Sequence, residues 1–255
     1  MFELNAVSFS IAEKVLLQSI SLQFSTGKIY GIIGPNGSGK STLIKLLARQ
    51  QSASSGQLLF NQRPVAYWKP REFAQQVAYL PQHLPQASHL KVKELLQMGR
   101  YAWQGLLGRH SEKDQQAITE ALQRTNMQRY ADQLVDTLSG GERSRAWLAM
   151  LLAQQSRFLL LDEPLAALDI AHQVEVMQLI QQLTQQLQIG VVIVIHDINL
   201  AARFCDQLIA LQNGQLLMQG TPQTLMTNTQ LKKIYHIDLN VISHPSVADT
   251  PVAFY

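Results

Sequence analysis

The sequence is poor in cysteine, in charge of one sign and in long apolar runs. Its single cysteine, Cys205, excludes an intrachain disulfide and with it a disulfide-stabilised scaffold. The 21 Lys and Arg residues against 18 Asp and Glu leave a net charge of only +3, so nucleic acid is not the expected partner. The longest apolar runs, such as residues 191–195, fall far short of the roughly 18 residues that span a bilayer. Residues 1–5 also lack the basic and apolar blocks of a signal peptide, so we expect a cytosolic or peripherally attached chain.

What is present is an alternation of apolar, β-branched runs with helical patterns. This alternation predicts an α/β fold with a mostly parallel sheet. The expected strands are residues 29–33, 77–80, 158–161, 191–195 and 208–211, and the expected helices are 40–48, 170–187 and 198–204. Three further strands, around 4–8, 20–24 and 58–60, have no helix between them and predict an added N-terminal antiparallel β subdomain.

The strand pattern stops between residues 84 and 152, where helices are expected over 92–98, 112–125 and 140–154. We therefore expect one domain with an inserted helical subdomain. Its parts are a nucleotide-binding core with the β subdomain (1–83 and 156–236), a helical subdomain (84–155) and a tail (237–255) that forms a hairpin or an extended arm. Residues 99–109 mix aromatics, glycines and arginines, which suits either a docking surface or an ordinary surface loop.

The strongest motif is a glycine-rich loop between an expected strand and an expected helix. It consists of Gly34, Pro35, Asn36, Gly37, Ser38, Gly39, Lys40 and Ser41, and it matches the phosphate-binding loop pattern. Glycines let successive N–H groups and the positive end of the helix face a phosphate chain. We expect Lys40 to reach the β- and γ-phosphates and the Ser41 hydroxyl to bind Mg²⁺.

Two acids, Asp162 and Glu163, end the apolar strand 158–161. Ligands bind at the carboxyl ends of parallel strands, so Asp162 is expected to complete the Mg²⁺ shell and Glu163 to orient or deprotonate water. The alternative, acids favoured by the dipole of a following helix, has little weight beside the phosphate loop.

A second pair of glycines opens the helix at 140–154, preceded by Ser139 and followed by Glu142. One nucleotide needs only one backbone cradle, so Gly140 and Gly141 are expected to close over the nucleotide of a second copy and to form a homodimer with two composite sites. The alternative is a simple capping box of Ser139 with Glu142.

Two single residues complete the candidate site. His196, after the expected strand 191–195, can bond a γ-phosphate, although a lone histidine is more often structural. Gln82 stands where the helical insert begins and could sense the γ-phosphate or Mg²⁺ and transmit that state to the insert.

With these elements in this order, the chain resembles the ATP-binding cassette (ABC) ATPase family from residue 1 to about 226. The resemblance implies ATP and Mg²⁺ as cofactors, no nucleic acid partner, and a head-to-tail homodimer with ATP between the chains. It assigns Glu163 as catalytic base, with Lys40, Gln82 and His196 at the catalytic centre, and Ser41, Gln82 and Asp162 as Mg²⁺ ligands. Beyond residues 34–41, the implied ATP contacts are Thr42, Gln82, Ser139, Gly140, Gly141, Glu142, Asp162 and the D-loop residue Asp169.

Within the family, several stretches resemble the importers of iron siderophores, haem and vitamin B12: residues 99–103, 141–147, 167–174, 196–199 and 251–255. This likeness implies ATP hydrolysis that powers import of iron(III)-hydroxamate siderophores across the inner membrane. It also implies a polytopic permease, a periplasmic or lipid-anchored binding protein, and a peripheral place on the cytoplasmic face. Haem, vitamin B12 or ferric citrate are the nearer alternatives, and a soluble cassette protein that acts on ribosomes or DNA is the more distant one.

The sequence departs from the family pattern at three positions. Ile11 stands where the family stacks adenine on an aromatic ring, and Phe9 lies two residues away. We therefore expect only modest discrimination of ATP over GTP. Leu165 replaces the usual Thr or Ser, and Ser144 the usual Gln, without touching the inferred chemistry.

Overall fold

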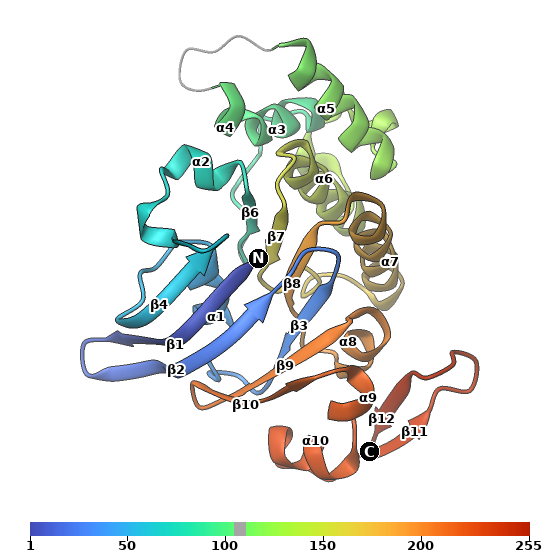
Figure 1. The fold of residues 1–255 in the computed structure, drawn as a ribbon. Helices are drawn as coiled ribbons and strands as arrows, with labels where there is room; N and C mark the ends of the chain where they lie inside the picture. Colours follow the sequence, from blue (N-terminus) through green and yellow to red (C-terminus); the bar gives the residue numbers. More distant parts are fainter. Residues whose placement is uncertain (105–110) are drawn as a thin grey trace.

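The computed structural model describes residues 1–104 and 111–255, and a six-stranded sheet runs through its centre (Figure 1). The strand order is β10-β9-β3-β8-β7-β6, with the five strands from β9 to β6 parallel and β10 antiparallel at the edge. The strands are β3 (Ile29–Ile33), β6 (Val77–Leu80), β7 (Phe158–Leu161), β8 (Gly190–Val194), β9 (Gln207–Gln212) and β10 (Gln215–Gly220). The predicted α/β class with a mostly parallel sheet is confirmed.

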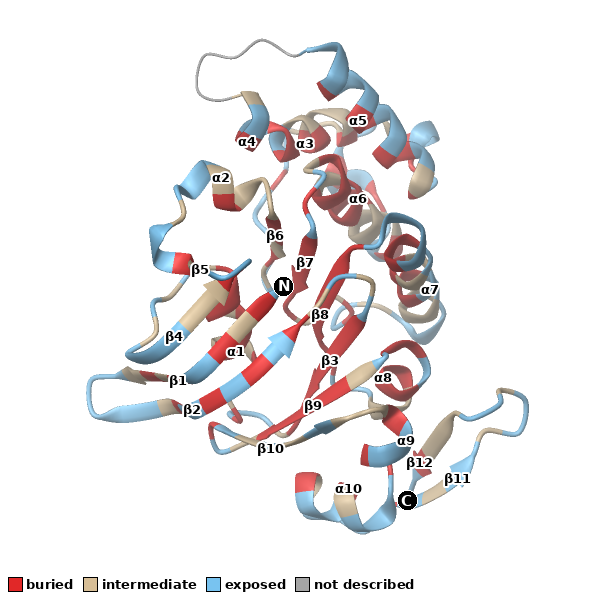
Figure 2. Cartoon of the chain, viewed as in Figure 1, coloured by how far each residue is buried: buried red, intermediate tan, exposed pale blue. Residues whose placement is uncertain are grey.

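Burial explains why these short runs form the central sheet. Every residue of β3, β7 and β8 is buried, as expected for strands covered on both faces (Figure 2). The edge strand β10 alternates exposed and half-buried residues instead. It returns from β9 through Asn213 and Gly214, both at positive φ, which is the turn geometry that suits a two-residue hairpin.

A second, antiparallel sheet of order β2-β1-β4-β5 packs beside the first. Its strands are β1 (Phe2–Ile11), β2 (Lys14–Phe24), β4 (Ser55–Phe60) and β5 (Arg63–Pro64). Helix α1 (Lys40–Leu47) contributes to the core shared by the two sheets, where the ring of Phe2 lies 4.7 Å from Phe60 and 5.1 Å from Phe158 between centroids. The predicted N-terminal antiparallel subdomain is therefore present.

Helices fill the segment between β6 and β7 and lie at the top of Figure 1. They are α3 (Val92–Gly99), α4 (Tyr101–Gln104), α5 (Glu112–Arg124), η2 (Gln128–Tyr130), η3 (Val135–Thr137) and α6 (Gly140–Ala153), while η1 (Val65–Tyr67) and α2 (Pro70–Ala74) precede β6. Helix α6 packs against both α3 and α5. The buried Arg100 anchors this packing, because its Nε donates to Asp114 at 2.7 Å and its Nη1 to the Ala153 carbonyl at 2.7 Å.

The stretch proposed for docking begins in this anchored region. Tyr101 and Trp103 are exposed, and Trp103 Nε1 donates to the Gln154 carbonyl at 2.7 Å. Residues 105–109 of the same stretch lie outside the described residues. The described part is thus a surface held in place by main-chain contacts.

The remaining helices are α7 (Ile170–Leu187), α8 (Ile198–Phe204), α9 (Pro222–Leu225) and α10 (Asn228–Tyr235). The tail ends in the hairpin of β11 (Asn240–Ser243) and β12 (Pro251–Phe254), in agreement with the hairpin expected there. The Asn199 amide on α8 holds this hairpin, because it accepts from the Ala253 N–H at 2.8 Å and donates to the Ala253 carbonyl at 3.0 Å. In the described part of the chain, no helix combines the length and the apolar character needed to cross a bilayer.

Candidate nucleotide-binding site

The predicted catalytic residues meet at one edge of the parallel sheet because their strands are neighbours. Strand β8 pairs with β3 on one side and with β7 on the other. The glycine-rich loop follows β3, Asp162 and Glu163 follow β7, and His196 comes two residues after β8. Their side chains therefore converge at the carboxyl ends of the strands, where α/β proteins bind ligands.

The glycine-rich loop depends on its glycines for shape. Gly34, Gly37 and Gly39 have φ values of 137°, 76° and 101°, in the region that side chains disfavour. A Cβ on Gly34 would stand 2.1 Å from the Leu211 carbonyl oxygen, so any larger residue would push the loop away from β9. Helix α1 starts directly after Gly39, which directs its free N–H groups into the loop.

Lys40 is held inside this loop. Its Nζ donates to the carbonyl oxygens of Gly34 and Pro35, each at 2.8 Å, and its side chain is buried. Burial lowers the pKa of Lys40, whereas the nearby carboxylates of Glu163 and Asp162 act in the opposite direction. The loop thus carries a positioned cation at the place where a phosphate chain would lie.

Ser41 and Asp162 form the second element of the site. Ser41 Oγ donates to Asp162 Oδ1 at 3.0 Å, and Asp162 is fully buried. Burial raises the pKa of Asp162, and its other oxygen, Oδ2, is buried without a hydrogen-bond partner. An unpaired buried carboxylate oxygen beside a hydroxyl fits a Mg²⁺ ion that shares ligands with phosphates. No cluster of three or more His, Cys, Asp or Glu side chains suited to a metal occurs within residues 1–104 and 111–255.

Glu163 is held on both carboxylate oxygens. Gln82 Nε2 donates to Oε2 at 2.7 Å, and His196 Nε2 lies 2.9 Å from Oε1. Glu163 itself has a φ of 52°, which turns the chain sharply after β7. Gln82 therefore contacts the predicted base in this structure, whereas the sequence suggested a role in sensing the γ-phosphate or Mg²⁺.

These residues line a cleft of about 890 Å³. The lining residues are Lys14, Val15, Leu16, Asn36, Gly37, Gly39, Lys40, Ser41, Thr42, Gln82, Glu163, His196, Asn213 and Gly214. The aliphatic Val15 and Leu16 are among them, whereas Ile11 is exposed outside this lining and Phe9 is buried in the core. The described lining of the cleft therefore contains no Phe, Tyr or Trp ring on which an adenine could stack.

Sequence reasoning missed two contributors to the cleft and its loop. The hairpin turn at Asn213 and Gly214 forms one wall, and the Asn-Gly pair between two apolar runs was a usable signal for that turn. Tyr235, on α10, accepts a hydrogen bond from the Gly34 N–H through its phenol oxygen. Burial raises the pKa of this phenol to about 12, so it stays protonated at neutral pH. No local pattern predicts this long-range contact.

The second glycine pair lies elsewhere in the same chain. Ser139 caps α6 and donates through its backbone N–H to Glu142 Oε2 at 2.9 Å, so the capping box considered as the alternative is present. Hydrogen bonds from Tyr130 and Ser139 lower the pKa of Glu142 to about 2. Neither residues 138–142 nor Asp169 occur among the described residues that line the phosphate-loop cleft. Within one chain, Gly140 instead lines a neighbouring pocket that shares Gln82 and Glu163 with the phosphate-loop cleft.

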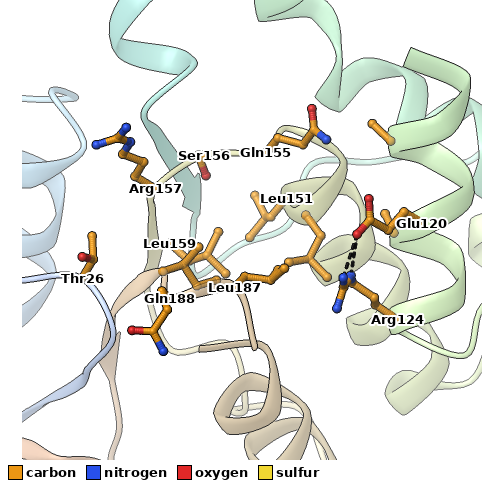
Figure 3. Close-up of a pocket in the computed structure, with 14 residues that line it drawn as sticks. Thr26, Glu120, Arg124, Leu151, Gln155, Ser156, Arg157, Leu159, Leu187 and Gln188 are labelled. Carbon is orange, nitrogen blue, oxygen red and sulfur yellow. Dashed lines mark hydrogen bonds and ion pairs between the residues drawn. The ribbon is translucent and has the colours of Figure 1, made fainter. Parts of the chain in front are cut away.

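A further pocket, shown in Figure 3, lies at the opposite end of the central strands. Arg157 precedes β7, Gln188 precedes β8, and α5 and α6 supply Arg124 and Leu151. It shares no residue with the predicted site. The pocket at the amino ends of the strands is therefore separate from the candidate nucleotide site at their carboxyl ends.

A phosphate loop, a hydroxyl–carboxylate pair and a glutamate held by glutamine and histidine define a nucleotide hydrolase of the phosphate-loop class. Residues 17–166 match the family model described as ABC transporter. The chain is 38% identical over 94% of its length to the petrobactin import ATP-binding protein of Bacillus anthracis, and it covers 89% of that protein. It is also 38% identical, over 91% of its length and 87% of the relative, to the iron(3+)-hydroxamate import ATP-binding protein of Bacillus subtilis. The chain therefore belongs to the ABC transporter family, and it is an ATP hydrolase coupled to transport.

Solved structures agree with this assignment. The ADP conformation of an ATP-binding cassette of an ABC transporter superposes with a TM-score of 0.83 at 20% identity, over 92% of this chain and 98% of that one. The dimeric structure of a bacterial ABC transporter cassette superposes with a TM-score of 0.74 at 25% identity, over 87% and 99%. The first likeness concerns the fold alone, and the second extends it to a cassette that forms dimers.

Proposed function

We propose that this chain is the ATP-binding and hydrolysing subunit of an importer for iron(III)-hydroxamate siderophores. The single observation that carries the hydrolytic part is the pairing of Ser41 with the buried Asp162 at the base of the phosphate loop. The substrate class is supported by the names of the relatives, which include import proteins for petrobactin and for iron(3+)-hydroxamates and a ferric enterobactin transport protein of Escherichia coli at 37% identity.

The residues divide the work of hydrolysis between them. Lys40 and the N–H groups of residues 36–42 bind the phosphates, and a ring nitrogen of His196 bonds the γ-phosphate. Ser41 and Asp162 would hold Mg²⁺, with Gln82 as a further ligand once it leaves Glu163. When bound there, Mg²⁺ would supply positive charge that neutralises the phosphate oxygens.

Glu163 acts as the general base in this proposal. Gln82 and His196 each take one lone pair of this carboxylate, so release of either bond frees a further acceptor site for the proton of the attacking water. Release of Gln82 would couple the base to the helical subdomain, because the chain enters that subdomain directly after Gln82. Hydrolysis and subdomain movement are thereby linked through one hydrogen bond.

The second cradle serves a second copy of the chain. The N–H groups of Gly140 and Gly141, in the first turn of α6, have no partner within their own helix and suit the γ-phosphate bound by the partner. Glu142 holds this loop through Ser139, and Asp169 stands beside it. Two chains packed head to tail would then enclose two ATP molecules.

The membrane partner is a polytopic permease, which works with a periplasmic or lipid-anchored binding protein. The support is an exposed apolar surface on the helical subdomain, where Met98 is 60% and Tyr101 58% exposed, next to Trp103. We assign this surface to the permease and place the chain peripherally on the cytoplasmic face of the inner membrane.

Haem is the second candidate substrate, because the hemin import ATP-binding protein of Shewanella denitrificans is 35% identical over 95% of this chain. Vitamin B12 and ferric citrate are further candidate substrates, by family likeness. The alternative to an importer subunit is a soluble ABC protein that acts on ribosomes or DNA. The transported substrate would not touch this subunit, so a transport assay must separate these candidates.

The test uses a tagged Glu163→Gln chain in its native cell, with Lys40→Ala as matched control. Membranes extracted in mild detergent with ATP are expected to yield a polytopic permease with the first variant and less of it with the second. Uptake of iron-loaded hydroxamates by that complex, compared with haem and cobalamin, then identifies the substrate. Recovery of ribosomal or DNA-repair proteins without a permease would contradict the transport proposal.

A further inference from the structure

The second glycine cradle packs against the start of α7, and one histidine fills the contact. A Cβ built on Gly141 would stand 2.1 Å from Cδ2 and 2.8 Å from Cγ of His172. A Cβ on Gly140 would lie 3.6 Å from Cδ2 of Leu168, an ordinary contact distance. The imidazole of His172 therefore occupies the space that any side chain at position 141 would need.

The imidazole is held in that position by Asp169. The backbone N–H of His172 donates to Asp169 Oδ1 at 2.9 Å, and Nδ1 of the same residue lies 2.8 Å from the same oxygen. These bonds lower the pKa of Asp169, so its carboxylate is ionised and accepts from an Nδ1–H. The Asp169 side chain is otherwise open to solvent, with 66% of its surface exposed.

The loop that carries Asp169 is itself braced. Gln173 Nε2 donates to the carbonyl oxygens of Leu165 at 3.2 Å and Leu168 at 3.0 Å. One turn further along both helices, Arg145 on α6 pairs with Glu175 on α7 at 2.8 Å. The start of α6 thus contacts the start of α7 at two successive turns. The first contact is His172 against Gly141, and the second is Arg145 with Glu175.

We propose that His172 is a positioning residue that fixes the spacing between the Gly140–Gly141 cradle and Asp169, so that both meet a second chain as one surface. The inference rests on the proposed function, because both elements act across the dimer. Backbone N–H groups stabilise a phosphate only at hydrogen-bond distance, so a shift of about 1 Å in the cradle weakens its grip. His172 is not among the described residues that line the phosphate-loop cleft.

Two substitutions separate the hydrogen bond from the packing. In His172→Asn, the amide atoms replace Nδ1 and Cδ2, so both the donor to Asp169 and the atom against Gly141 are kept. In His172→Leu, two methyl groups fill similar space but nothing donates to Asp169. Both are made in the Glu163→Gln chain, and two quantities are measured: ATP binding to the single chain at low protein concentration, and ATP-driven dimer formation by sedimentation.

We expect His172→Leu to raise the protein concentration needed for dimer formation about tenfold, with single-chain ATP affinity unchanged within about twofold. His172→Asn is expected to dimerise like the parent. A purely structural role would lower the single-chain ATP affinity and the thermal midpoint together. If His172→Leu dimerises as readily as the parent, this inference is overturned alone. If the Glu163→Gln chain itself remains monomeric with ATP, that result contradicts the composite site of the proposed function and also this inference.

A double variant gives an independent check. Gly141→Ala is expected to impair dimer formation, because its methyl group meets the His172 ring, and His172→Ala in the same chain should restore part of the loss. If the double variant loses as much dimer formation as the two single variants together, the His172 ring is not the reason that position 141 requires glycine. That result would overturn the inference. The thermal midpoint of each variant reports whether it folds.

Discussion

His196 Nε2 lies 2.9 Å from Oε1 of Glu163, at the end of two neighbouring parallel strands. Gln82 holds the other oxygen of the same carboxylate, so the proposed base is bonded on both sides by groups that could also bind a nucleotide. Release of either bond frees a further lone pair of this base for the attacking water. The site thereby joins the chemistry at β7 to the helical subdomain that begins after Gln82.

Glu163→Gln is expected to abolish ATP hydrolysis while leaving ATP binding intact, because an amide cannot accept the proton from water. Phosphate release at saturating ATP measures the loss, and size-exclusion chromatography with light scattering shows the accumulated dimer. Near-normal turnover in a preparation free of contaminating ATPase would falsify the assignment of Glu163.

Lys40→Ala is expected to weaken ATP binding at least about tenfold, since a hydrogen bond from a charged group contributes about 1.5–3 kcal/mol. Equilibrium binding of a fluorescent ATP analogue measures the change. Circular dichroism serves as the control, because Lys40 also donates to the carbonyl oxygens of Gly34 and Pro35. Unchanged affinity in a folded variant would count against the phosphate loop.

The preference of the site for ATP over GTP is expected to be much less than a hundredfold in affinity, because Val15 and Leu16 in the cleft lining are aliphatic and Phe9 is buried. A hundredfold preference needs about 2.7 kcal/mol of base-specific contact. Competition binding measures the ratio. Ile11→Tyr should tighten both nucleotides by a similar factor, since every base can stack on a ring. A strong ATP preference in the parent would refute this expectation.

Asp114→Asn is expected to destabilise the helical subdomain by about 3 kcal/mol, because it leaves the Arg100 guanidinium buried without a counter-ion. Burial alone would raise the pKa of Asp114, but bonds from Ser111 and Arg100 outweigh it and hold the pKa well below the usual range. The contribution is thus fully present above the ordinary carboxyl pKa of about 3.9 and is lost as the pH falls through the depressed value.

Urea denaturation at neutral and at acidic pH measures both effects, and the difference between Asp114→Asn and the parent should shrink on acidification. Asp132→Asn is the matched control, because its ion pair with Lys93 lies at the surface and its loss should change little. An equal effect of the two substitutions would contradict the role of the buried pair.

The sequence by itself determined the order of strands and helices, the phosphate loop and the two acids after β7. These features depend on local patterns: apolar runs of β-branched residues, glycines before a helix, and acids at a strand end. Strand ends and helix starts also predicted Gln82, His196 and the second cradle, and the family pattern added Asp169. The fold class predicted from these patterns is the one observed.

Only the tertiary structure decided which of these residues touch. Gln82 and His196 meet on Glu163, Tyr235 bonds Gly34, and the ring of His172 fills the space beside Gly141. Several of these contacts join residues that are far apart in the chain, and even the near ones depend on how neighbouring strands and helices pack. Local periodicity gives each element but carries no information about the side chains that such packing brings together.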